Sequence, residues 1–174
     1  MPQNNFVPSR DEAARLAEVR RYAILDTPPD GAFDRITRLA VRIFRVPVAI
    51  ISVVDHDRIW FKSRQGIDFN QIARDPGLCA SAILQNDPYV LTDAAADPHA
   101  LANPLVSGAA GLRFYAGSQL RTRSGGYNLG MMCIIDYQPR SIDDREIAML
   151  EELAGIVSDE LEMRLEVRKA LERD

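Results

Sequence analysis

The sequence predicts an α+β fold with a central, mostly antiparallel sheet of five or six strands. Terminal helices pack on one face of this sheet, and short helices and a loop cover a pocket on the other. Three observations support this: apolar residues recur at helical spacing near both ends of the chain, runs of β-forming residues fill its middle, and tight turns at 55–58 and 124–126 join pairs of strands as hairpins.

Composition limits the class of protein. At 174 residues, one domain with a single substantial core is the default. The net charge of −4 gives no basic surface for nucleic acid or for an anionic membrane, so neither is expected as a partner. The sequence has neither an apolar run of about 20 residues, as a membrane span requires, nor a secretory signal, so we expect a cytoplasmic protein.

Two helices are expected before the first strand. Ser9 and Glu12 form a capping-box pattern, which opens a helix that runs to about Leu25. Asp30 is placed to cap the second helix, which runs to about Phe44 with apolar residues three and four apart.

The middle of the chain reads as strands and one short helix. Residues 46–54 are nearly continuous β-formers, which predicts a strand covered on both faces. Residues 59–64 return as the second strand, and 67–74 is an irregular segment. A short helix over 78–84 and a third strand over 89–92 follow.

A long loop and a second hairpin come next. Residues 93–111 are rich in Ala, Asp, Pro and Gly, and a loop of this length in a compact domain is usually functional. Residues 114–121 form the fourth strand, in which Gly117 marks a bulge or a close approach by a backbone or ligand. The fifth strand covers 127–135.

The last helix is longer than one face of a domain needs. Ser141 with Asp144 is the predicted cap, and the helix runs to about Glu172. Apolar residues along it repeat with heptad spacing, which indicates a coiled-coil partner or a connector.

Five stretches of this chain resemble a GAF domain, the sensory module of many bacterial histidine kinases and diguanylate cyclases. They are residues 10–40, 46–67, 74–84, 90–120 and 129–142. The resemblance implies a domain over 9–160, preceded by a flexible leader over 1–8 and followed by a helical extension over 161–174. It places the pocket between the sheet and residues 74–112.

The resemblance implies a non-catalytic sensory and regulatory function. The domain would bind a small ligand, dimerise, and pass a signal to a kinase or cyclase effector in the same chain or in trans, for example in a two-component system. A homodimer is expected through the first and last helices, with candidate contacts at Leu16, Val19, Ile147, Leu150, Val157 and Leu161. One alternative is a pure dimerisation module with a collapsed pocket, whereas a pocket of roughly 300 Å³ or more would favour a ligand sensor. A further alternative is a Cys-based redox enzyme similar to the free methionine sulfoxide reductases.

The candidate pocket residues come from the segments that would enclose such a site. They are Trp60, Arg74, Cys79, Ile83, Asp93, His99, Asn103, Arg113, Phe114, Tyr115 and Cys133. Arg74 or Arg113 could neutralise a nucleotide phosphate, but the family's cyclic-nucleotide sequence pattern is missing. Arg113 could instead pin the loop by pairing with Asp93 or Asp97.

No specific cofactor follows from the sequence. A covalent bilin needs a cysteine near 101–106, where none stands, and haem would depend on His56 or His99. No CxxC motif or Cys/His cluster has the spacing of a zinc site. Free methionine sulfoxide reductases use this fold with clustered cysteines, and Cys79 and Cys133 would meet only if the fifth strand faces the short helix. In this chain, Cys79 and Cys133 are expected to be free, buried thiols.

Overall fold

The computed structural model describes residues 9–75 and 77–174, with side chains from Glu12 onwards. The predicted leader over 1–8 and the predicted cap at the side chain of Ser9 lie outside this part of the chain. The predicted α+β fold is confirmed: six antiparallel strands form one sheet in the order β3-β2-β1-β6-β5-β4. The strands are β1 (Val48–Val54), β2 (Arg58–Gln65), β3 (Gln71–Ala73), β4 (Tyr89–Leu91), β5 (Phe114–Arg121) and β6 (Asn128–Asp136).

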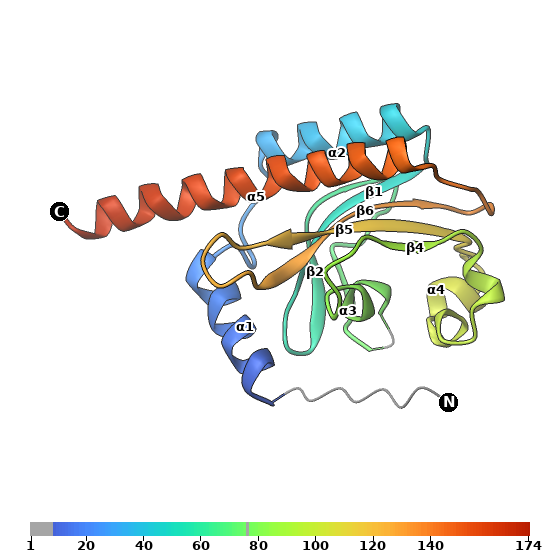
Figure 1. Ribbon diagram of the computed structural model, residues 1–174, viewed down its shortest axis with the longest axis horizontal. Coiled ribbons are helices and arrows are strands. Elements are labelled where there is room, and N and C mark those ends of the chain that lie inside the picture. Colours follow the sequence, from blue (N-terminus) through green and yellow to red (C-terminus); the bar gives the residue numbers. More distant parts are fainter. Residues whose placement is uncertain (1–8, 76) are drawn as a thin grey trace.

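Helices form a layer on each side of the sheet (Figure 1). On one face, α2 (Gly31–Phe44) runs alongside the long α5 (Asp144–Glu172), whose C-terminal part extends beyond the sheet. The other face carries α3 (Leu78–Ala82) and α4 (Pro104–Ser107), with the single turns η1 (Ala94–Ala96) and η2 (Ala100–Ala102). The first helix, α1 (Ser9–Tyr22), lies at one end of the sheet, and the C-terminal end of α1 contacts α5.

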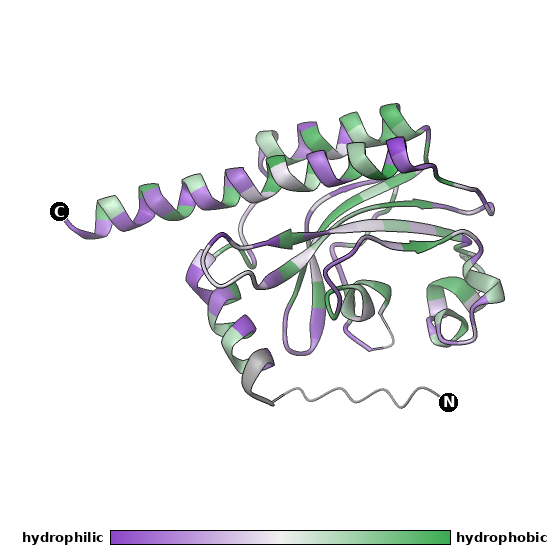
Figure 2. Cartoon of the chain, viewed as in Figure 1, coloured by the Kyte–Doolittle hydropathy of each residue, from purple (hydrophilic) through white to green (hydrophobic). Residues whose placement is uncertain are grey.

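Each face of the sheet has its own core. The residues of β1, β5 and β6 alternate between the faces, so both layers receive apolar side chains. Many of the segments coloured green for hydrophobic residues in Figure 2 lie in the strands. Phe114, Met132 and Ile134 pack towards α2 and α5, whereas Tyr115, Met131 and Cys133 pack towards α3 and α4. A sheet covered on both sides explains why β1 is buried at every position.

Local signals explain where α2 and α5 begin. The side chain of Asp30 accepts a hydrogen bond from the Ala32 amide, as predicted. The predicted cap of α5 at Ser141 is wrong, because Asp143 accepts from the Glu146 amide and Glu146 accepts from the Asp143 amide in a complete capping box.

Two further boundaries differ from the prediction. Helix α1 ends at Tyr22 instead of Leu25, because Ala23 adopts a left-handed conformation that breaks the helical path. The segment over 67–74 contains β3, which pairs with β2 at the edge of the sheet. With only three residues, this strand is too short to show an alternating pattern.

Arg15 fixes α1 to the sheet although it is a charged residue with only 6% of its surface exposed. Its guanidinium donates to the carbonyls of Val54, Asn128 and Leu129, at the ends of β1 and β6. Glu12 pairs with Arg15 and also accepts a bond of 2.6 Å from Arg74. The charges are therefore paired and hydrogen-bonded, as burial requires.

We expect this cluster to make stability depend on pH at the acid end. Burial alone would raise the pKa of Glu12, but hydrogen bonds from Arg15 and Arg74 outweigh it and lower the pKa from 4.5 to about 2. A carboxyl with a lowered pKa stabilises the fold above pH 4.5, and this contribution disappears as the pH falls towards 2. Urea unfolding at pH 6 and pH 3 should show a smaller stability difference for Glu12→Gln than for the wild type; an unchanged difference would contradict this assignment.

The apolar seam of α5 faces its own sheet. Leu150, Val157 and Leu161 are at most 5% exposed and belong to the core shared with α2, and so does Val19 of α1. These four residues of the predicted dimer contact are therefore unavailable to a second copy, because an amphipathic helix first buries its apolar stripe within the protomer. Leu16 and Ile147 are partly exposed.

Polar contacts hold α5 well past the predicted domain boundary at residue 160. Glu162 accepts from the Tyr22 hydroxyl and from the Arg123 amide. Arg164 pairs with Asp30, and Arg168 donates to the Arg21 carbonyl. In the described ranges 9–75 and 77–174, no helix is long and apolar enough to cross a membrane.

Candidate functional site

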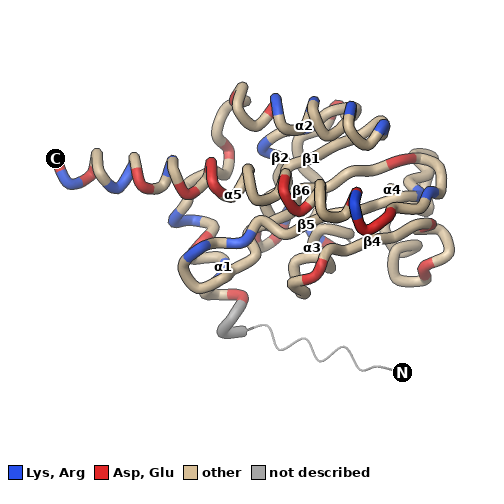
Figure 3. The backbone as a smooth tube through the Cα atoms, turned by 45° about the horizontal axis from the view of Figure 1, so that its top comes forward, with Lys and Arg blue, Asp and Glu red and all other residues tan. Residues whose placement is uncertain are grey.

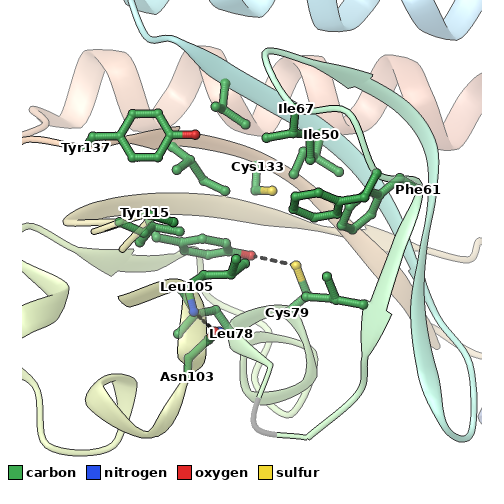
Figure 4. A pocket seen from close by; sticks show the side chains of 16 residues that line it. Ile50, Phe61, Ile67, Leu78, Cys79, Asn103, Leu105, Tyr115, Cys133 and Tyr137 are labelled. Carbon is green, nitrogen blue, oxygen red and sulfur yellow. Dashed lines mark hydrogen bonds between the residues drawn. The ribbon is translucent and has the colours of Figure 1, made fainter. Parts of the chain in front are cut away.

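A small cavity of about 80 Å³ lies between the sheet and the α3–α4 layer (Figure 4). We call it the central cavity. The sheet supplies one wall, through residues of β1, β2, β3, β5 and β6. The lining residues are Val48, Ile50, Phe61, Ile67, Phe69, Ile72, Leu78, Cys79, Asn103, Leu105, Ala110, Leu112, Tyr115, Cys133, Ile135 and Tyr137.

The central cavity is apolar and its lining carries no charged side chain. The few polar groups are the two thiols, the hydroxyls of Tyr115 and Tyr137, and the Asn103 amide. A phosphate or carboxylate would lose its hydration here without gaining a cationic partner. The lining therefore suits a small uncharged molecule and does not fit a cyclic nucleotide.

Tyr115 and Cys79 make the central polar contact of the cavity. The Tyr115 hydroxyl lies 3.2 Å from the Cys79 sulfur. Burial raises the pKa of Tyr115, so this hydroxyl stays protonated and can donate. Gly117 makes room for it, because a Cβ at Gly117 would lie 3.0 Å from the hydroxyl oxygen and 2.9 Å from the Met131 methyl carbon. The close approach predicted at Gly117 is thus to side chains of its own sheet.

The segment that covers the cavity is held by side chains that cap the starts of its short helices. Asn103 is 3% exposed and its side chain accepts from the Leu105 amide, which starts α4. Asp93 accepts from the Ala95 amide and starts η1. Asp93 and Asn103 therefore shape the loop over 93–112, and only Asn103 also lines the cavity.

Arg113 pins the same loop, but through different partners from those predicted. Its guanidinium donates to the carbonyls of Val106 and Leu112, at 3.0 and 2.9 Å, and not to Asp93 or Asp97. It does not line the central cavity, so it cannot clamp an anion there.

We expect Arg113→Ala to lower the free energy of unfolding by about 1–3 kcal/mol, because it leaves two loop carbonyls without their charged donor. Arg123→Ala is the matched control: Arg123 is highly exposed and pairs with Asp159 at the surface, so its loss should change stability far less than the loss of Arg113. Thermal and urea unfolding measure both variants. Equal stability of the two variants would show that Arg113 does not hold the cover.

The other candidate pocket residues lie elsewhere. Trp60 and Phe114 belong to the core under α2 and α5, on the opposite face of the sheet, so neither lines the cavity. Arg74 is committed to Glu12 and to the Asp55 carbonyl. His99 is exposed, with its Nε2 2.9 Å from the Ser81 hydroxyl in a surface groove.

The remaining candidates divide between the cavity and the core around it. Cys79, Tyr115 and Cys133 meet in the cavity, while Ile83 is buried in the same core without lining it. The condition for the two cysteines to meet is fulfilled, because β6 faces α3. Sequence reasoning missed most of the apolar lining, including Phe69 and Tyr137, which follow strands in segments that gave no periodic signal.

This chain belongs to the GAF domain family, whose model matches residues 9–161. It is 40% identical over 148 residues to the cyclic di-GMP phosphodiesterase PA2567 of Pseudomonas aeruginosa, and the match covers 84% of this chain. The chain spans only about a quarter (25%) of the length of that curated relative. GAF domains are typical of sensory and regulatory proteins, which is the class that family and fold define.

Solved structures share the fold at low sequence identity. The GAF domain of an Acinetobacter phosphoenolpyruvate-protein phosphotransferase has a TM-score of 0.65 at 15% identity, over 89% of this chain and 95% of that one. A free methionine-R-sulfoxide reductase from Neisseria meningitidis has a TM-score of 0.59 at 22% identity, over 93% and 95%. At these identities the likeness establishes the fold and leaves function to the residues of the site.

Proposed function

We propose that this GAF domain is a non-catalytic sensory domain that takes a small uncharged ligand in the central cavity and reports its presence through α5. The observation that carries the proposal is that β5 and β6 form a wall shared by the cavity and by α5. Side chains of these two strands reach the cavity on one face and the α5 core on the other.

The wall formed by β5 and β6 offers a direct mechanical route from the cavity to α5. Tyr115 and Cys133 line the cavity, and their sequence neighbours Phe114 and Ile134 belong to the core that contains Val157 of α5. A ligand that shifts a strand on one side must therefore shift the packing on the other, since close-packed interiors transmit strain. The size of the response is limited by the ligand's difference in affinity for the two arrangements.

The volume of the cavity limits the ligand. At about 80 Å³ it has roughly half the volume of an engineered 150 Å³ cavity that binds benzene or xenon. The cavity accommodates only a molecule of a few heavy atoms. A larger ligand would require the cover over 93–112 to move outwards.

Xenon is a suitable probe for this proposal, because it is uncharged, nearly spherical and attracted to apolar cavities. We expect xenon pressure to shift the amide resonances of β5 and β6 and, through the shared wall, those of α5 near Val157. The variant Leu105→Phe adds volume on the cover side of the cavity and should abolish these shifts. The control Leu84→Phe, at an exposed position two residues after the end of α3, should leave them unchanged. Shifts confined to the cavity, without any in α5, would refute the proposed route.

A second function, as a pure interaction module, is favoured by one observation. The cavity is well below the roughly 300 Å³ of ordinary ligand sites. If wild-type protein shows no xenon response and native mass spectrometry finds no retained molecule, this second function is the better one.

We also propose that the domain is a homodimer and that its contact is the outer side of α5 and α2. The predicted seam is buried, but α5 carries a second stripe of exposed apolar residues, at spacings of seven and four: Met149, Ile156, Met163, Val167 and Leu171. On α2, Leu39 and Ile43 are also 46% and 40% exposed. Single exposed apolar residues are ordinary, whereas a stripe along one helix supports an interface.

Charge complementarity favours a second copy of this chain as the partner. Arg35, Arg38 and Arg42 are exposed positions of α2, and Glu152 is an exposed position of α5 next to the apolar stripe. Figure 3 shows basic residues along α2 and acidic residues along α5. In a two-fold symmetric contact, α2 of each protomer would meet α5 of the other, which pairs these opposite charges.

We expect Ile156→Glu to weaken dimerisation at least about tenfold, because it places a carboxylate in the middle of the apolar stripe. Leu84→Glu is the control, as Leu84 has the same exposure of 51% but lies on the opposite side of the sheet. Sedimentation velocity over a concentration series measures both. A wild-type protein that stays monomeric, or two variants that dissociate equally, would exclude this interface.

The output of the domain is proposed from its relative. The 40% identity to part of a cyclic di-GMP phosphodiesterase supports a cytoplasmic role in regulating an effector of cyclic-dinucleotide signalling, in the same chain or in trans. The domain itself contributes no catalysis in this proposal.

A further inference from the structure

The central cavity holds two thiols that no part of the proposed ligand binding requires. Cys79 comes from α3 and Cys133 from β6, 54 residues later, and both are buried and free. Figure 4 shows both sulfurs directed into the cavity, with the Tyr115 hydroxyl bonded to Cys79. Both cysteines line this one cavity, where α3 packs against β6.

The surroundings give the two thiols different chemistry. The neighbouring Cys133 thiol lowers the pKa of Cys79, and the nearby hydroxyls of Ser52 and Tyr115 act in the same direction against the effect of burial. The pKa of Cys133 is raised, because it shares the proton of this pair and is buried. Cys79 is therefore the nucleophile, and Cys133 keeps its proton.

The cavity also selects what can reach Cys79. Its volume of about 80 Å³ and its uncharged lining admit a small neutral molecule and disfavour charged oxidants. Hydrogen peroxide has two heavy atoms and no charge, so it fits this space.

We propose that Cys79 and Cys133 are a peroxide-responsive pair that forms a reversible disulfide inside the central cavity. The Cys79 thiolate attacks one oxygen of hydrogen peroxide, the O–O bond breaks, and hydroxide leaves and takes a proton to become water. This gives a sulfenic acid at Cys79. Cys133 then attacks that sulfur: the S–S bond forms, the S–O bond breaks, and the hydroxyl leaves as water with the thiol proton. Two thiols thereby supply the two electrons that reduce one peroxide to two waters, and a dithiol reductant reverses the bond.

The disulfide would act on the shared wall without any other ligand. It would tie α3 to β6 at Cys133, between Met132 and Ile134, which pack in the α5 core. This inference does not depend on the xenon result, since it concerns bond formation between residues of the chain itself.

The test treats the purified full chain with stoichiometric hydrogen peroxide and follows intact mass and free thiols. We expect the loss of two hydrogens and of both free thiols, a Cys79–Cys133 link in the peptide map, and full recovery with dithiothreitol. Cys133→Ser should stop at the sulfenic acid, trapped by dimedone on Cys79, and Cys79→Ser should leave Cys133 unreacted.

Tyr115→Phe gives a graded readout. It removes one hydrogen bond to the Cys79 thiolate, so the rate at neutral pH should fall about threefold, because the smaller thiolate fraction is partly offset by higher nucleophilicity. The proposal is overturned if the folded protein resists peroxide while urea-unfolded protein oxidises. It is equally overturned if oxidation gives links between chains, or a stable sulfenic acid in the wild type.

Discussion

Replacing Gly130 by alanine is expected to prevent folding, or to lower the free energy of unfolding by more than about 4 kcal/mol. A Cβ at this position would lie 1.8 Å from the Ser52 carbonyl oxygen and 2.8 Å from the Val53 Cα. Both are backbone atoms of β1, the central strand that pairs with β6, so neither can rotate away as a flexible side chain could. The two strands would have to separate at the middle of the sheet.

Gly155→Ala is the matched control for this prediction. Gly155 lies in α5 with no atom within 4 Å of an added Cβ, so the same substitution should raise stability by about 0.5–1 kcal/mol. Circular dichroism and urea unfolding distinguish the two variants. A Gly130→Ala protein with nearly wild-type stability would mean that β1 and β6 are not paired in this register.

Arg15→Met is expected to cost about 3 kcal/mol or more. Methionine keeps much of the buried stem, but the carbonyls of Val54, Asn128 and Leu129 lose their donor and Glu12 loses one of its two cationic partners. Removing one side of a buried, hydrogen-bonded charge leaves the other uncompensated, which is among the most destabilising of single changes.

The control is Arg20→Met on the exposed side of the same helix, where less than about 0.5 kcal/mol is expected. Hydrogen exchange adds a local readout: in Arg15→Met the amides of α1 should lose protection before those of the sheet. A loss of protection spread evenly over the chain would show that Arg15 does not specifically dock α1.

Local signals in the sequence were sufficient for most helices and strands. The cap at Asp30, the boundaries of β5 and the glycine turn at 124–126 depend on residues close together in the chain, and the structure has all three. The Asp143–Glu146 box was also readable, since both residues stand directly before the apolar repeat of α5. The prediction of Ser141 placed the start of the helix two residues too early.

Relationships between distant segments could not be read in the same way. Phe114 and Tyr115 are adjacent in a strand, so alternation requires that only one of them faces the cavity, but a sheet buried on both faces gives no clue to which. The apolar seam of α5 looks the same whether it meets a partner or its own sheet. The placement of Cys79 and Cys133 in one cavity depends on how α3 folds back onto β6, which periodicity does not encode.

The anchored length of α5 has a consequence for whatever is attached to it. Arg164 and Arg168 fix the rotation of the helix against Asp30 and the Arg21 carbonyl, and the helix continues to Glu172. Each residue turns an α-helix by about 100° and advances it by about 1.5 Å, so a continuing helix would leave the domain with a set angular phase. Inserting seven residues there would nearly preserve that phase, whereas inserting two would point the attached part to the opposite side.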